Sequence, residues 1–221
     1  MTAPGAQVLG DREVTLLVDH AVLPGLLAVP PDALGVVAFA HGSGSSRFSP
    51  RNRLVAAFLN AGRVGTLLFD LLTPGEAAER GNVFDVELLA ARLAGATRWL
   101  QGQPETRQLP VGYFGASTGT AAALWAAADL GDEVSAVVSR GGRPDLAEGR
   151  LASVRAPTLL IVGGADDVVL ELNRRALESM TCAAELRVVA GAGHLFEEPG
   201  TLEEVAQLAR DWLLRYLRPA S

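Results

Sequence analysis

The sequence predicts an α/β protein with a mainly parallel central sheet and helices on both of its faces. Short apolar runs rich in β-branched residues alternate with helical patterns along the chain, and this alternation indicates βαβ units. Most of the later runs are apolar at consecutive positions, as parallel strands covered on both faces require. The expected strands are 14–18, 26–29, 36–40, 64–69, 111–114, 134–138, 158–162 and 186–190.

The first two strands flank His20 and Pro24 and are expected to form an antiparallel pair at one edge of the sheet. A helix is then expected to begin at Ser49-Pro50, because an N-cap serine and a first-turn proline precede an apolar stripe. Gly62 stands where the C-terminal cap of that helix belongs.

Further helices are expected over 84–100 and 120–130. The pattern from Thr201 to Glu204 predicts a capping box at the start of the last helix. The segment 139–156, between the sixth and seventh strands, is long enough for one small helix. We therefore expect no cap domain and an open site.

The chain of 221 residues is interpreted as a single domain spanning 1–221. Its net charge of −6 and the lack of a basic cluster argue against a nucleic-acid partner. The first fourteen residues contain no signal-peptide core, and no apolar run approaches the roughly 18 residues of a membrane span. We therefore expect a cytoplasmic protein without a membrane partner. No motif specifies its oligomeric state.

Cys182 is the only cysteine, so an internal disulfide is excluded and no Cys/His metal spacing exists. The sequence offers no general base near this residue, and we interpret it as a packing residue. No metal and no cofactor are expected.

The segment 111–119 carries the strongest functional signal. A short apolar strand runs into Gly115-Ala116-Ser117-Thr118-Gly119, and an alanine-rich helix follows. A sharp Gly-x-Ser-x-Gly turn between a strand and a helix exposes the serine hydroxyl above the sheet, and its glycines let the strand and helix approach closely. Ser117 is therefore the candidate nucleophile.

Two later strands also end in glycines followed by polar residues. Gly163-Gly164 precedes Asp166 and Asp167, and Gly193 precedes His194. Each candidate lies just past the C-terminal end of an expected strand, where open α/β sheets build their sites. The order along the chain is therefore serine, aspartate, histidine.

These motifs resemble those of the α/β-hydrolases, and within them the small, lidless dienelactone-hydrolase-like proteins. The resemblance covers essentially the full length and also includes His41-Gly42-Ser43-Gly44 after a strand. The enzymes that give the group its name use a cysteine nucleophile, whereas the Gly-x-Ser-x-Gly turn of this chain, the nucleophile elbow of the resemblance, carries Ser117. The resemblance therefore implies general ester hydrolysis.

In this interpretation His194 takes the proton of Ser117, because imidazole titrates near neutrality. Asp166, which matches the family spacing from Gly163, would orient the imidazole. Its neighbour Asp167 is interpreted as a solvated carboxylate or as the N-cap of a helix starting near Val169, and a shift of the acid by one residue stays open.

Of the other histidines, His20 is expected in a surface turn, and His41 is expected to brace its glycine loop by hydrogen bonding. The elbow makes the Thr118 backbone N–H one oxyanion donor. The resemblance implies that the Ser43 backbone N–H is the other.

Three arginines are weaker candidates. We call residues 41–44, which contain the expected donor Ser43, the oxyanion loop. Arg47 follows this loop and Arg140 follows the sixth strand, so either could bind an anionic substrate group. The alternative for these two and for Arg143 is a structural salt bridge or a solvated side chain. The loop 71–85 is a further candidate for the entrance, although nothing in it specifies a ligand.

The predicted function is that of a serine carboxylesterase acting on small-molecule esters through an acyl-enzyme on Ser117. A thioesterase or acyltransferase would use the same residues. A non-catalytic binding protein on the same fold is the alternative from another class. The low aromatic content of 5% and the lack of a lid insertion predict weak activity on long-chain lipids.

Overall fold

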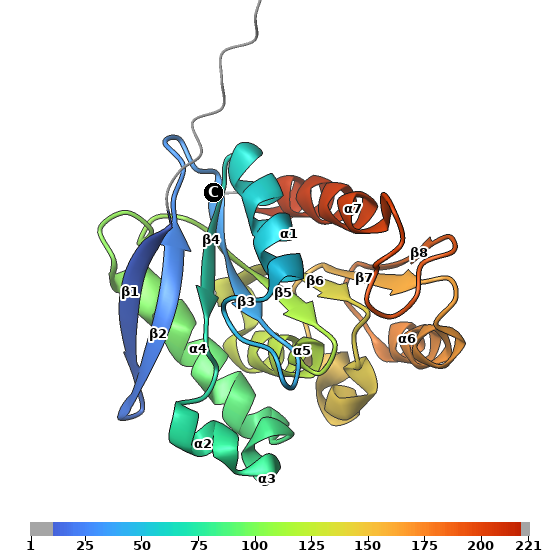
Figure 1. Cartoon of the computed structure of the whole chain (residues 1–221), viewed down its shortest axis with the longest axis horizontal. Helices are drawn as coiled ribbons and strands as arrows, with labels where there is room; N and C mark the ends of the chain where they lie inside the picture. The colour runs from blue at the N-terminus through green and yellow to red at the C-terminus, as the bar shows by residue number, and fades with distance from the viewer. Residues whose placement is uncertain (1–10, 218–221) are drawn as a thin grey trace, which may run out of the picture.

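The computed structural model describes residues 11–217. These residues contain one eight-stranded sheet in the order β1-β2-β4-β3-β5-β6-β7-β8 (Figure 1). All the expected strands are present, most of them longer by a few residues. They are β1 (Arg12–Val18), β2 (Ala21–Ala28), β3 (Gly35–Ala40), β4 (Val64–Phe69), β5 (Val111–Ala116), β6 (Val134–Arg140), β7 (Thr158–Gly163) and β8 (Ala184–Val189).

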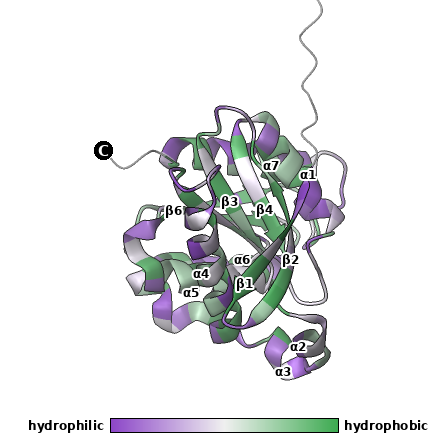
Figure 2. Ribbon diagram, turned by 90° about the vertical axis from the view of Figure 1, so that its left-hand side faces the viewer, coloured by the Kyte–Doolittle hydropathy of each residue, from purple (hydrophilic) through white to green (hydrophobic). Residues whose placement is uncertain are grey.

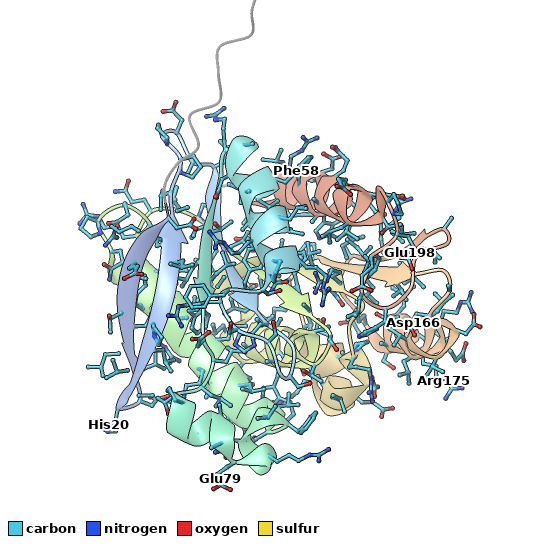
Figure 3. All side chains as sticks on the ribbon, viewed as in Figure 1. His20, Phe58, Glu79, Asp166, Arg175 and Glu198 are labelled. Carbon is cyan, nitrogen blue, oxygen red and sulfur yellow. The ribbon has the colours of Figure 1, made fainter. Side chains whose placement is uncertain are left out.

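The antiparallel edge is confirmed. β1 pairs antiparallel with β2, and β2 pairs antiparallel with β4, while every other neighbouring pair is parallel. Asp19 and His20 form the turn between β1 and β2, with φ of 45° and 67°. Two central residues with positive φ suit the tight hairpin turns that match the twist of the strands. His20 is therefore an exposed turn residue, as expected (Figure 3).

Helices cover both faces of the sheet. α1 and α7 lie over one face, and α4, α5 and α6 lie over the other (Figure 1). The helical segments are α1 (Pro50–Ala61), α2 (Pro74–Ala78), α3 (Arg80–Val83), α4 (Val86–Gly102), α5 (Gly119–Leu130), α6 (Asp167–Ser179) and α7 (Thr201–Tyr216), with 3₁₀ segments η1 (Gly131–Glu133) and η2 (Pro144–Ser153).

The sheet separates two apolar cores. Alternate residues of β5 face opposite ways, so that Tyr113 packs with α4 and α5 while Phe114 packs with α1 and α7. Figure 2 shows the apolar strands between helices that carry polar residues on their outer sides. The Tyr113 hydroxyl shares a 2.5 Å hydrogen bond with the Thr97 hydroxyl, and burial raises the pKa of Tyr113. A buried hydroxyl needs such a partner because desolvation is costly.

The ends of α1 and α4 follow from capping. Ser49 accepts a hydrogen bond from the Asn52 N–H, and Gly62 ends α1, as expected. α4 starts two residues later than the predicted helix 84–100, because Asp85 caps it by accepting from the Leu88 N–H at 3.0 Å.

The predicted capping box at Thr201 is wrong. Gly200 is the N-cap of α7, with φ of 84°, and Thr201 is the first helical residue. The Thr201 hydroxyl donates instead to the Glu198 carbonyl oxygen at 2.7 Å. A capping box does form at Thr73 and Glu76, where it opens α2.

No cap domain interrupts the chain between β6 and β7, where η2 is the only helical segment. The segment 71–85 contains α2 and α3, which project from the sheet on the side of α4 (Figures 1 and 2). Within residues 11–217 no helix combines the length and apolar character that a bilayer crossing requires.

Candidate active site

The nucleophile elbow lies between β5 and α5, at the middle of the sheet. Ser117 has φ of 51°, a left-handed conformation that is unusual for a residue with a side chain. Its N–H donates to the Arg140 carbonyl oxygen at 3.1 Å, and its carbonyl oxygen accepts from the Arg143 N–H at 3.1 Å. The end of β6 therefore holds the strained backbone of the elbow in place.

The glycines of the elbow are required by close approach. A Cβ on Gly115 would lie 2.6 Å from the Thr120 Cα, and one on Gly119 would overlap the Ala40 carbonyl oxygen. Backbone atoms cannot move aside as a flexible side chain can. The Gly-x-Ser-x-Gly pattern thus lets α5 start directly against β3 and β5.

Ser117, His194 and Asp166 form a chain of polar contacts. Ser117 Oγ lies 3.4 Å from His194 Nε2, and His194 Nδ1 lies 2.7 Å from Asp166 Oδ2. The first distance is long for a hydrogen bond, as is common at active sites without substrate. The His194 side chain is 38% exposed, whereas that of Asp166 is 15% exposed. Three loops far apart in the sequence thus meet at one end of the sheet.

The two adjacent aspartates differ in position. Asp166 is the N-cap residue of α6, but its side chain contacts His194 and caps no helical N–H. Figure 3 shows it where α6 begins. Asp167 is an exposed first-turn residue, so the reading of Asp167 as the N-cap is wrong, and the helix begins before Val169. The structure therefore brings Asp166 to the imidazole.

The loops that carry Asp166 and His194 approach each other through glycine. A Cβ on Gly163 would lie 2.6 Å from the Gly193 carbonyl oxygen. The glycines after β7 and β8 therefore allow the contact between the carboxylate and the imidazole.

The two expected oxyanion donors lie side by side, but one of them already has a partner. Thr118 is the N-cap of α5, a position where backbone N–H groups lack intrahelical partners. The Ser43 N–H donates to Thr118 Oγ1 at 2.9 Å. The preceding Gly42 packs against Ser117, since a Cβ there would lie 3.1 Å from the Ser117 Cβ.

His41 braces the oxyanion loop, as its sequence position predicted. Its Nε2 accepts from the Leu71 N–H at 3.3 Å, so Nδ1 carries the proton and donates to the Gly42 carbonyl oxygen at 3.0 Å. Burial lowers the pKa of His41, which favours the neutral imidazole. The imidazole thus ties the loop after β3 to the loop after β4.

Arg47 and Arg143 adopt the structural alternative. The Arg47 N–H donates to Asp70 Oδ1 at 2.7 Å, and its guanidinium forms an ion pair with the same carboxylate. Arg143 donates twice to Asp145, at 2.8 and 2.7 Å, and these bonds raise the pKa of Arg143. Both guanidinium groups are therefore paired within the protein.

Arg140 differs from these two arginines. Its side chain is buried, and its Nη1 has no hydrogen-bond partner among residues 11–217. Burial, together with the nearby positive charge of Arg51, lowers the pKa of Arg140 to about 10. A desolvated cation without a counter-charge is costly, so this position invites an anionic partner.

A cavity of about 430 Å³ adjoins the oxyanion loop. Much of its wall comes from the segment 71–85, which the sequence indicated as a candidate entrance, whereas α2 within it was not predicted although the pattern Thr73-x-x-Glu76 is a capping-box signal. The oxyanion loop and the Arg47–Asp70 ion pair form its polar side. Its apolar side is lined by Pro24, Leu71, Leu72, Pro74, Ala77, Val83 and Leu89.

Among the described residues, the other reactive groups form no second candidate site. Residues 11–217 hold no group of three or more His, Cys, Asp or Glu side chains arranged to bind a metal ion. Cys182 is half-buried, and burial raises the pKa of its thiol. A raised pKa disfavours the reactive thiolate.

Comparison with solved structures gives close matches over the whole chain. Dienelactone hydrolase from Anabaena variabilis is 53% identical, covers 96% of this chain and 100% of its own, and has a TM-score of 0.93. XC6422 from Xanthomonas campestris, described as an α/β serine hydrolase without a lid, has a TM-score of 0.74 at 22% identity, over 96% of this chain and 97% of its own. The latter likeness shows the fold alone.

Among curated proteins, one from Mycobacterium tuberculosis strain H37Rv, named "Putative phosphoribosyl transferase", is 61% identical over 209 residues. These residues are 95% of this chain but 47% of that protein, so the chain spans about half the length of this relative. The model of the dienelactone hydrolase family matches residues 69–218. The chain therefore belongs to the dienelactone hydrolase family.

Proposed function

We propose that this protein is a serine hydrolase that cleaves small carboxylic esters through an acyl-enzyme on Ser117. The observation that carries the proposal is the contact chain from Ser117 Oγ to His194 Nε2 and from His194 Nδ1 to Asp166 Oδ2. A nucleophile, a base and an orienting carboxylate in this arrangement suit acyl transfer.

In the first half-reaction Ser117 Oγ attacks the ester carbonyl carbon while His194 Nε2 takes the hydroxyl proton. The negative charge that develops on the carbonyl oxygen would be held by the N–H groups of Thr118 and Ser43. The tetrahedral intermediate then expels the alcohol, which receives the proton from His194. The acyl group remains on Ser117.

In the second half-reaction water attacks the acyl-enzyme carbonyl, and His194 takes a proton from this water. Collapse of the second tetrahedral intermediate releases the carboxylic acid and returns the proton to Ser117. Asp166 keeps the imidazole oriented and stabilises the imidazolium in both halves, without taking the proton itself.

The same acyl-enzyme could pass its acyl group to an alcohol or a thiol, so a thioesterase or acyltransferase remains within the proposal. The name of the mycobacterial relatives belongs to proteins of about twice this length. We assign no phosphoribosyl transfer to this chain, because the dienelactone hydrolase relative that matches it over its full length accounts for these residues.

We also propose that Arg140, rather than Arg47, meets an anionic group of the substrate. Arg47 is neutralised by Asp70, whereas Arg140 Nη1 has no partner among the described residues. A cytoplasmic location and a small-molecule partner belong to the same proposal.

The test is hydrolysis of 4-nitrophenyl esters from acetate to laurate by the wild type and Ser117→Ala. Loss of the serine should lower kcat on the order of a millionfold. Asp167→Asn is the matched control, since this exposed carboxylate lies outside the contact chain, and it should keep the wild-type rate. Equal rates in wild type and Ser117→Ala would overturn the proposal. Failure of a fluorophosphonate to label Ser117 would favour a binding protein.

A further inference from the structure

The cavity beside the oxyanion loop has one wall made by a small exposed segment. We call residues 73–84, which contain α2 and α3, the strap. Pro74, Ala77 and Val83 of the strap line the cavity together with Leu71, Leu72 and Leu89. Its volume of about 430 Å³ lies within the range of roughly 300–1,000 Å³ that is typical of ligand sites.

The cavity adjoins the loop that packs against Ser117, although Ser117 itself does not line it. Gly42 and Ser43 line it, and a Cβ on Gly42 would lie 3.1 Å from the Ser117 Cβ and 3.8 Å from Ser117 Oγ. An ester whose carbonyl oxygen reaches the N–H groups of Ser43 and Thr118 therefore has one of its two substituents next to this cavity.

The position of the cavity relative to His194 indicates that it lies beside the acyl substituent of the ester and not beside the alcohol. Apart from Pro24 of β2 and Leu89 of α4, the cavity lining comes from the segments after β3 and β4, whereas His194 follows β8 on the other side of β5. The leaving alcohol must take its proton from His194, so the alcohol lies on that side. The acyl group, which stays attached to Ser117 until the second half-reaction ends, therefore lies on the side of the cavity.

The strap is held by one carboxylate, although no residue of α2 or α3 is buried. Glu76 Oε2 accepts from the Thr73 N–H at 2.8 Å, and Glu76 Oε1 accepts from Arg92 Nη2 at 2.7 Å. The Glu76 carbonyl oxygen accepts from the Asn82 side chain at 3.0 Å. Arg92 is itself buried and also donates to the Val18 carbonyl oxygen. The wall is therefore fixed in place by Glu76.

We propose that this cavity binds the acyl chain of the substrate as an uncharged apolar group of medium length, and that the strap sets its upper length. The inference rests on the proposed esterase function. The Arg47–Asp70 ion pair at the rim is neutral as a pair, so it leaves no net charge for an acidic acyl group.

The cavity volume bounds the chain length. With a methylene taking on the order of 30 Å³, the share of liquid volume that a water molecule has, the cavity of about 430 Å³ accommodates at most on the order of fourteen carbons. Each buried methylene should raise kcat/KM by about fourfold, which corresponds to about 0.8 kcal/mol. We therefore expect kcat/KM to rise from acetate to octanoate and to fall at palmitate, whose chain exceeds the cavity.

The test places a large side chain on each of two neighbouring alanines of α2. Ala77 lines the cavity and Ala78 does not, so Ala77→Trp fills the cavity while Ala78→Trp adds the same ring outside it. Ala77→Trp should lower the ratio of octanoate to acetate kcat/KM at least tenfold. Ala78→Trp should leave the ratio unchanged. Val83→Phe serves as a second filling variant if Ala77→Trp does not fold.

A second pair of variants tests the strap. Glu76→Gln removes the ion pair to Arg92 and should raise palmitate turnover relative to octanoate, because the wall is no longer held. Glu79→Gln, on an exposed carboxylate of the same segment, should leave this ratio unchanged.

The outcomes separate the two proposals. If no ester is cleaved and Ser117 resists a fluorophosphonate, the esterase function itself fails. If esters are cleaved by a Ser117-dependent route but the filling variants leave the chain-length ratio unchanged, the function stands and the acyl site is overturned.

Discussion

The Ser43 N–H donates to Thr118 Oγ1 across 2.9 Å, so the side chain that follows Ser117 in the sequence occupies one of the two expected oxyanion donors. An N–H points at one acceptor at a time with good geometry. In the proposed mechanism a substrate carbonyl must therefore replace the Thr118 hydroxyl before the Ser43 N–H can stabilise the developing charge. In the proposed mechanism Thr118 thus contributes a donor through its backbone and a competitor through its side chain.

Thr118→Ala removes this competitor. We expect kcat/KM for 4-nitrophenyl acetate to rise by up to about fivefold, because a hydrogen bond with a net value of about 1 kcal/mol no longer has to be exchanged. Thr118→Ser, which keeps the hydroxyl, should stay near the wild-type value. A tenfold fall in Thr118→Ala would contradict this account and would show that the hydroxyl holds the loop in its active position.

Asp166→Asn tests which of the adjacent aspartates orients His194. The change keeps the shape of the side chain but removes the charge that stabilises the imidazolium, and we expect kcat to fall by about ten-thousandfold. Asp167→Asn is the matched control and should keep kcat within about twofold. Steady-state rates on one short ester suffice, and a larger loss in Asp167→Asn would move the acid by one residue.

His41 should make stability depend on pH. Because burial lowers its pKa in the folded state, the unfolded chain takes up a proton at higher pH than the folded chain does. The contribution of His41 to the free energy of unfolding is therefore fully present above the ordinary imidazole pKa of about 6.5, and it declines as the pH falls below that value. Thermal unfolding between pH 8 and 5 should show a shallower decline in His41→Gln than in the wild type.

His20→Asn is the control for this experiment. The residue lies in an exposed turn with positive φ, which asparagine tolerates, so the change should leave the pH dependence of the melting temperature as it is. An identical slope in His41→Gln and the wild type would exclude His41 as the source.

Arg140→Met tests the unpartnered cation. Replacing a desolvated charge by an apolar side chain of similar length should leave the protein as stable or raise the free energy of unfolding by up to about 2 kcal/mol. Sulfate, compared with chloride at equal ionic strength, should raise the melting temperature of the wild type more than that of the variant. A marked loss of stability with an unchanged sulfate effect would assign Arg140 a structural role.

The strands and the elbow could be predicted because they depend on local patterns. Consecutive apolar residues mark a strand covered on both faces, and the small residues around Ser117 mark a turn in which strand and helix nearly touch. The prediction that Ser117, Asp166 and His194 meet in space then needed only the rule that the carboxyl ends of parallel strands lie at one edge of the sheet.

Helix ends were less predictable where two residues compete for the cap. Thr201 is a residue type that favours the N-cap position, but Gly200 provides the left-handed conformation that the incoming chain requires. Asp166 stands at a helix start, yet its carboxylate contacts His194 because the chain after β8 passes beside it. In both cases a neighbour distant in sequence or the path of the chain decided the outcome.

The sequence by itself determined the class of fold, the elbow and the residue types of the candidate site, since these follow from periodicity and short motifs. Only the tertiary structure decided which arginine is paired, that Thr118 Oγ1 accepts from Ser43, and that Glu76 holds the cavity wall through Arg92. These facts depend on side chains brought together from separate loops. Pairing and burial are properties of such encounters, and no local pattern in the chain encodes them.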